Sequence, residues 1–255
     1  MRPHNDPLLA AFSRGIDTIE GIRMLNFDHY EALSFDCYGT LIDWETGITD
    51  AVRSVAEAHG LDMTNAQILS LYSEIEPQAQ QGEYAEYRVV LRNVMQGIAD
   101  RLGFTPVDTD LDCLSDTLGD WPVFPDTVNA LRALKSRYKL AILSNTDDGL
   151  FAQTAPNLGV EFDKIITSQQ AGTYKPSIHN FILAIDHIGV GADRLLHVAE
   201  SMFHDIVPAK SIGLSAVWVN RHSGDDSTGA TRPVQGEPDL EVPDLATLVS
   251  LMGLG

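Results

Sequence analysis

Short apolar runs alternate with amphipathic segments over most of the chain, and this alternation predicts its fold class. A largely apolar run at residues 33–35 stops at Asp36, and similar runs follow at residues 140–143, 165–166, 195–199 and 216–219. Between these runs, apolar residues recur at helical spacing, as they do over residues 178–188. Strands that are apolar on both faces and alternate with helices indicate βαβ units. The pattern therefore predicts an α/β protein with a doubly wound, Rossmann-like parallel sheet.

A block of helices interrupts this alternation. Helical spacing extends over four consecutive stretches, at residues 46–59, 66–74, 83–102 and 112–118. We therefore expect an all-helical insertion at residues 47–122, between the two parts of an α/β core at residues 30–46 and 123–255. Residues 1–29 contain helix-like pieces at 7–12 and 16–24, and we interpret them as a peripheral arm, with an oligomer contact as the alternative.

Local signals predict features near the end of the core. Asp126 precedes a helical pattern and is expected to cap that helix with its side chain. Residues 223–238 are rich in Gly, Ser, Asp and Pro and predict a loop. Residues 245–251 predict a final helix.

Composition excludes several classes of partner. The chain has 255 residues, with 17 Lys and Arg against 36 Asp and Glu, which gives a formal net charge of −19. Nucleic acids and anionic membranes attract basic surfaces, so we expect neither as a partner. Two cysteines do not form a secreted disulfide framework, and we find neither a secretory signal nor an apolar run of membrane length. We expect a cytoplasmic protein that acts on a small molecule, with a homodimer as an open alternative.

Polar residues stand at the carboxyl ends of the predicted core strands. Ligand sites in open α/β sheets lie at this edge, so these residues are candidates for a common site. Each also has a simpler interpretation, as a turn cap, a helix cap or a solvated surface charge. The candidates are Asp36, Ser144, Asn145, Lys175, Glu200 and Asp205.

The segment from Asp36 to Leu41, with the sequence Asp-Cys-Tyr-Gly-Thr-Leu, resembles the nucleophile loop of the haloacid dehalogenase superfamily. The Tyr two residues after the Asp is similar to that of the 2-haloacid dehalogenase (type II) branch. Phosphatase members carry a second Asp there, as general acid and base. Ser144-Asn145, Lys175 and the segment 200–205 match the second, third and fourth motifs of the superfamily in order.

This resemblance implies a hydrolase with a helical cap over a Rossmann-like core and no required cofactor. Asp36 would displace halide from a small 2-haloalkanoic acid, and water would hydrolyse the resulting aspartyl ester to a 2-hydroxy acid. Lys175 would pair with Asp36 and stabilise negative charge. The implied catalytic residues are Asp36, Thr40, Ser144, Asn145, Lys175 and Asp205. The residues expected to contact substrate are Cys37, Tyr38, Arg88 and Ser201.

Several positions depart from the dehalogenase pattern and keep other activities open. Glu200 stands where those enzymes have Ser, Met202 where they have Asn, and Phe181 where they have Tyr. Glu200 could bind a cation or pair with Lys175. One alternative is therefore a Mg²⁺-dependent phosphatase, whose metal would be held by Asp36, the Cys37 carbonyl, Glu200 and Asp205. The others are hydrolysis at another activated carbon, such as that of a strained ring, and a binding protein without enzymatic activity.

Overall fold

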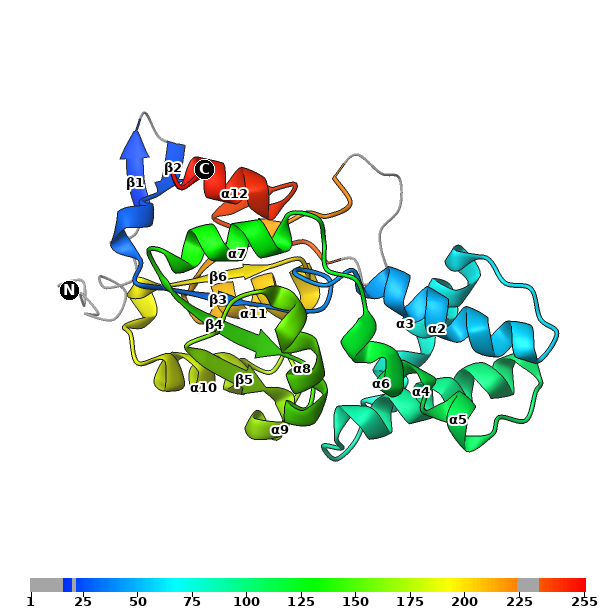
Figure 1. Ribbon diagram of the computed structural model, residues 1–255. Helices are drawn as coiled ribbons and strands as arrows, with labels where there is room; N and C mark the ends of the chain where they lie inside the picture. Colours follow the sequence, from blue (N-terminus) through cyan, green and yellow to red (C-terminus); the bar gives the residue numbers. More distant parts are fainter. Residues whose placement is uncertain (1–15, 20–21, 224–233) are drawn as a thin grey trace.

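The computed structural model describes residues 16–19, 22–223 and 234–255. Its centre is a six-stranded, entirely parallel sheet with the order β5-β4-β3-β6-β7-β8, which confirms the predicted fold class (Figure 1). The strands are β3 (Ala32–Phe35), β4 (Lys139–Ser144), β5 (Lys164–Thr167), β6 (Leu195–Ala199), β7 (Ser215–Val219) and β8 (Leu240–Val242). Strand order reverses beside β3, so the ends of β3, β4 and β6 meet at the point where such sheets bind ligands.

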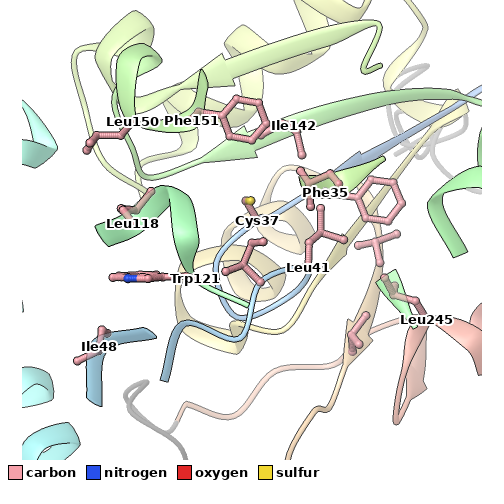
Figure 2. Close-up of a cluster of buried hydrophobic side chains, with 14 of the residues drawn as sticks. Phe35, Cys37, Leu41, Ile48, Leu118, Trp121, Ile142, Leu150, Phe151 and Leu245 are labelled. Atoms are coloured by element: carbon pink, nitrogen blue, oxygen red, sulfur yellow. The ribbon is translucent and has the colours of Figure 1, made fainter. Parts of the chain in front are cut away.

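Helices cover both faces of the sheet, and alternate residues of each strand point to opposite faces. Leu33 and Phe35 of β3 belong to the hydrophobic cluster that includes Leu131 of α7 (Thr127–Lys135) and Leu245 of α12 (Leu245–Leu251); Figure 2 shows part of this cluster. Ala32 belongs to the opposite cluster, with Phe181 of α10 (Ile178–Ile188) and residues of α11 (Val207–Ser211). Ser34 and Asp36 follow the same alternation as Ala32, so they lie on the α10 side.

A second group of helices lies beyond the carboxyl edge of the sheet, and we call it the cap (Figure 1). It contains α2 (Trp44–Ala58), α3 (Asn65–Ala79), α4 (Tyr87–Leu102), α5 (Asp108–Leu111), α6 (Cys113–Thr117) and the 3₁₀ turn η2 (Leu118–Asp120). Trp121 packs against the start of α2 so closely that a Cβ on Gly47 would approach its ring to 2.3 Å. This contact fixes the cap where the chain leaves and re-enters the core. No helix of the described part of the chain is long and apolar enough to cross a membrane.

The remaining elements are short. They are the strands β1 (Ile16–Ile19) and β2 (Ile22–Leu25), the helices α8 (Asp148–Thr154) and α9 (Ser168–Ala171), the 3₁₀ turns η1 (Phe27–His29), η3 (Ala155–Leu158) and η4 (Ala192–Arg194), and the π-helical turn η5 (Met202–Ile206).

The structure corrects the sequence-based picture in the N-terminal segment and in the cap. Residues 16–19 and 22–24, expected in a helix-like piece over 16–24, are not helical, because β1 and β2 pair as antiparallel strands, as their β-branched Ile and Thr residues favour. The helix-like piece at 7–12 lies outside the described residues, as does most of the predicted loop at 223–238. In the cap, α3 continues to Ala79 and α4 begins only at Tyr87, four residues later than expected.

Asp126 holds the expected position before α7 but does not cap it with its side chain. Its carboxylate accepts two hydrogen bonds from Arg221 Nη1, at 2.9 and 3.0 Å, and one from Leu245 N at 2.6 Å. A buried guanidinium competes better for this carboxylate than backbone amides do, because a charge-assisted pair is stronger. The residue therefore ties α12 to the sheet.

Candidate active site

The register of the two central strands sets the position of the site. In the β3–β6 pair, Ser34 lies opposite His197, and Asp36 N donates to Val198 O at 3.2 Å as β3 ends. Ser34 Oγ and His197 Nδ1 are 2.9 Å apart, and both side chains are fully buried. Since alternate residues of a strand share a face, the Asp36 side chain projects on this same side, beyond the histidine.

Lys175 reaches this edge from the loop before α10 and is 1% exposed. Its Nζ donates to Asp36 Oδ1 at 2.8 Å, to Asp205 Oδ1 at 2.6 Å and to Leu143 O at 3.0 Å. An ammonium has three N–H groups, so all of them are satisfied within the protein. Asn145 holds the backbone of the same residue: its Oδ1 accepts from Lys175 N at 2.7 Å, and its Nδ2 donates to Lys175 O at 3.1 Å.

Burial and charge act together on these three groups. Burial opposes the ammonium form of Lys175, but Asp205 and Asp36 outweigh this effect and raise its pKa. Burial also opposes ionisation of Asp205, yet Lys175 and His197 outweigh it and lower the pKa of this carboxyl. For Asp36, burial dominates and raises the pKa, while Lys175 limits the rise. The result is a fixed cation between two carboxyl groups, with the pKa of Asp36 raised and that of Asp205 lowered.

The loop after β3 supports Asp36 from its other side. Gly39 has a φ of +99°, which lets the chain turn back so that Thr40 Oγ1 donates to Asp36 Oδ2 at 2.9 Å. The same hydroxyl accepts from Glu200 N at 2.8 Å and so links the first and fourth motifs. Cys37 is buried in the hydrophobic cluster of Figure 2, and its carbonyl accepts the N–H groups of residues 40, 41 and 42.

The fourth motif positions a second carboxylate. Asp205 lies in η5, and His197 Nε2 is 3.0 Å from its Oδ1. Its other oxygen, Oδ2, is buried and has no hydrogen-bond partner among the described residues. Ser201 N-caps the turn, since its Oγ accepts from His204 N at 3.1 Å. Asp205 thus presents one unused oxygen next to the nucleophile.

A cavity of about 310 Å³ opens over these groups, between the core and the cap. It is lined by Asp36, Tyr38, Trp44, Tyr72, Ser73, Glu76, Pro77, Gln80, Gln81, Tyr87, Ser144, Asn145, Lys175, Pro176, Glu200, Ser201, Phe203, His204 and Asp205. Ser144 Oγ is buried there without a hydrogen-bond partner among the described residues. This volume lies at the lower end of the range for small-molecule pockets.

Comparison with known proteins agrees with this geometry. A sequence profile described as haloacid dehalogenase-like hydrolase matches residues 30–213. The chain belongs to this hydrolase family. The resemblance seen in its four motifs is therefore confirmed.

Relatives from bacteria are similar over almost their whole length. Haloacetate dehalogenase H-2 of Moraxella sp. (strain B) is 29% identical over 238 residues, which cover 88% of this chain and 98% of the relative. (S)-2-haloacid dehalogenase H-109 of Pseudomonas putida is 28% identical over 222 residues, which cover 86% of this chain and 96% of the relative. The solved L-2-haloacid dehalogenase of Xanthobacter autotrophicus superposes with a TM-score of 0.73 at 24% identity, over 88% of this chain and 98% of that one. This structural likeness supports the haloacid dehalogenase-like fold.

Most of the residues proposed from the sequence of this haloacid dehalogenase-like hydrolase meet at one place. Seven of them line the cavity: Asp36, Tyr38, Ser144, Asn145, Lys175, Ser201 and Asp205. Thr40 and Cys37 lie behind it, and Thr40 touches the nucleophile. The Tyr38 hydroxyl is 2.9 Å from Thr154 Oγ1, so this end of the side chain contacts α8.

Two charged residues are placed differently from the sequence-based expectation. Arg88 does not line the cavity: its Nη1 donates to Ser115 Oγ at 2.9 Å and to Asp116 Oδ1 at 3.0 Å, because acidic residues of the neighbouring helix attract it. Glu200 lines the cavity but does not pair with Lys175, whose three hydrogen bonds go elsewhere.

Sequence reasoning missed other residues of the site. His197 was hidden inside an apolar strand pattern, and only its register opposite Ser34 reveals its partners. Tyr72 and Glu76 lie four residues apart on α3 and line the cavity together. Their helical spacing was a usable signal, but nothing in the sequence showed which face of α3 meets the core.

The residues proposed as ligands of Mg²⁺ in the phosphatase alternative have other partners in the structure. The Cys37 carbonyl accepts hydrogen bonds from Leu41 N at 2.7 Å and Ile42 N at 3.0 Å, so its lone pairs are used. Lys175 Nζ already lies between Asp36 Oδ1 and Asp205 Oδ1, while Asp205 Oδ2 has no hydrogen-bond partner among the described residues. Within the described ranges, no three His, Cys, Asp or Glu side chains are arranged to hold a metal ion.

Proposed function

We propose that this hydrolase releases halide from a small 2-haloalkanoic acid through a covalent ester on Asp36 and yields a 2-hydroxy acid without a cofactor. The observation that carries the proposal is the buried Lys175, which holds Asp36 and Asp205 at 2.8 and 2.6 Å on the floor of a small cavity. The similarity to curated haloacetate and (S)-2-haloacid dehalogenases supports the choice of substrate class.

In the first step, a carboxylate oxygen of Asp36 attacks the carbon that bears the halogen. The C–O bond forms as the carbon–halogen bond breaks, and the halide leaves with the bonding electron pair. Lys175 and Thr40 hold the carboxylate in place, which reduces the entropic cost of reaching the attack geometry. Ser144 Oγ, buried and without a partner among the described residues, is available to donate to the substrate carboxylate.

In the second step, water attacks the Asp36 carbonyl carbon of the ester. We assign the positioning of this water to Asp205, because its Oδ2 is buried beside the nucleophile and unused by the described residues. Lys175 stabilises the negative charge that develops on the former carboxylate oxygen. The ester bond breaks, the 2-hydroxy acid leaves, and Asp36 returns with one oxygen from water; each turnover releases one halide ion and one proton.

The phosphatase alternative is less well supported. Its route requires a general acid and base two residues after the nucleophile, where this chain has Tyr38. The hydroxyl of Tyr38 is hydrogen-bonded to Thr154 and is buried, and burial raises its pKa well above the usual value. This side chain therefore cannot exchange a proton readily near neutral pH.

A single-turnover experiment in H₂¹⁸O tests the proposal. With enzyme in excess over 2-chloropropanoate, the first product should carry ¹⁶O from Asp36, and the label should appear in the protein. Asp36→Asn should release no chloride, while Asp50→Asn, an exposed change on α2, should leave the rate unchanged. Incorporation of ¹⁸O into the product of the first turnover would contradict the covalent route. Magnesium-dependent phosphate release from a phosphate ester, without chloride release, would favour the phosphatase alternative.

A further inference from the structure

The charges around the cavity are unusual for a site that receives an anion. Besides Asp36 and Asp205, two more carboxyl groups line the cavity: Glu76 from the cap and Glu200 from the core. Among its described lining residues, Lys175 is the one Lys or Arg, and its three N–H groups are already used. Arg88 and Arg92 of the cap point elsewhere and pair with aspartates of α5 and α6 and their junction.

Two aromatic rings connect the additional carboxyl groups. Trp44 and Glu200 both border the nucleophile loop at Gly39, where a Cβ would lie 3.3 Å from Trp44 Nε1 and 3.4 Å from Glu200 Oε2. The Trp44 ring packs edge-on against the Tyr72 ring, with centroids 5.8 Å apart. Glu76 follows Tyr72 by one helical turn. We call Glu200, Trp44, Tyr72 and Glu76 the acidic wall.

Buried polar atoms show that this cavity is built for a polar ligand. Ser144 Oγ and Asp205 Oδ2 both belong to lining residues that are at most 1% exposed, and neither has a hydrogen-bond partner among the described residues. An unsatisfied buried polar group costs free energy, so a ligand or water is expected to complete it. These atoms lie at the Asp36 end, where the reacting carbon and the substrate carboxylate belong.

We propose that the acidic wall binds a protonated amine of the substrate, so that the enzyme prefers zwitterionic 2-substituted acids to simple anionic ones. The inference rests on the proposed function for the position of the reacting carbon. Carboxylates attract the ammonium. A substrate carboxylate held by neutral donors near Ser144 would leave the amine to extend toward Glu76 and Glu200.

The ionisation of Glu200 agrees with this assignment. Burial, together with the nearby carboxylates of Asp36, Glu45 and Asp205, raises the pKa of Glu200 to about 8, while Arg221 limits the rise. A bound ammonium would offset these like charges and lower that pKa. Amine binding near neutral pH should therefore release a proton, and it should strengthen as the pH rises toward about 8.

Calorimetric titration of the wild-type enzyme with two stable product analogues tests the inference. The ligands are 4-amino-2-hydroxybutanoate and 2-hydroxypentanoate, which differ by an ammonium in place of a methyl group. The amine should bind at least about tenfold more tightly. Glu76→Gln and Glu200→Gln should each reduce this ratio about threefold or more, and Glu74→Gln should not, because Glu74 pairs with Arg101 and lies outside the cavity.

The outcomes separate this inference from the proposed function. A wild-type ratio near one, or a ratio that neither Glu76→Gln nor Glu200→Gln reduces, would overturn the acidic wall as an amine site. Chloride release from 2-chloropropanoate tests the nucleophilic chemistry without any amine. A high binding ratio without chloride release would retain the acidic wall and reject halide as the leaving group.

Discussion

Glu200→Gln should stabilise the protein at alkaline pH and have little effect at acid pH. The pKa of Glu200 is raised from 4.5 to about 8, so the folded chain holds a proton there that the unfolded chain releases. Between these two values the folded state binds more protons, and stability therefore falls as the pH rises, levelling off above about 8. Gln resembles the protonated side chain and removes this dependence.

The size of the effect follows from the shift. At about 1.4 kcal/mol per pKa unit, the rise sets a ceiling of about 5 kcal/mol on the destabilisation of the wild type by the ionised Glu200. Water reaches the cavity that Glu200 lines, and screening by this water reduces the penalty. We expect Glu200→Gln to be more stable than the wild type by about 2–3 kcal/mol at about pH 8.5 and equal to it at about pH 5.

Urea unfolding followed by tryptophan fluorescence at the two pH values measures this difference. Glu74→Gln is a suitable control, because Glu74 is exposed and Arg101 lowers its pKa. This variant should change the free energy of unfolding little, and it should not be more stable than the wild type at alkaline pH. A stability difference between the wild type and Glu200→Gln that is the same at both pH values would refute the reasoning. It would show that Glu200 ionises alike in the folded and unfolded chains.

Three further substitutions distinguish chemical roles from packing. Lys175→Met should abolish chloride release and lower the free energy of unfolding by about 3–5 kcal/mol, since it leaves two buried carboxyl groups without their cation; kinetics and urea unfolding measure the two effects. Tyr38→Phe should cost about 1 kcal/mol through the lost hydrogen bond to Thr154, with kcat unchanged, and a large fall in kcat would assign its hydroxyl to the reaction. Ser144→Ala should raise KM about tenfold with little change in stability, because its Oγ has no described partner, and an unchanged KM would remove it from the substrate site.

The core could be predicted from the sequence because its strands are short apolar runs. Residues 178–188, 195–199 and 245–251 have in the structure the bounds that their patterns predicted. The edge strand β8 was missed, since three residues with one buried side chain give almost no pattern. Residues 16–24 were interpreted as helix-like although β1 and β2 are strands, because apolar residues at short intervals fit both periods when the segment is brief.

The candidate site was predictable as far as it depends on strand ends, and less so where it depends on the cap. Parallel strands bring their carboxyl ends to one edge, so Asp36, Ser144 and Asp205 had to lie near one another. Arg88 and Arg92 are four residues apart and share a side of α4, but this spacing does not reveal that acidic residues of α5 and α6 occupy that side. Helix periodicity identifies a face, whereas only packing decides what the face meets.

The charge balance of the cavity bears on how a carboxylic acid could bind there at all. Lys175 donates its three N–H groups to Asp36, Asp205 and Leu143 O, so it has none left for a substrate carboxylate. The carboxylate must then be held by neutral donors such as Ser144, which are weaker than an arginine fork. A simple haloacid would bring its negative charge close to Glu76 and would favour the protonated form of Glu200, whereas an amine on the same molecule would pair with Glu76 and favour the ionised form of Glu200. The preference for zwitterions thus follows from the same three hydrogen bonds that hold the nucleophile in place.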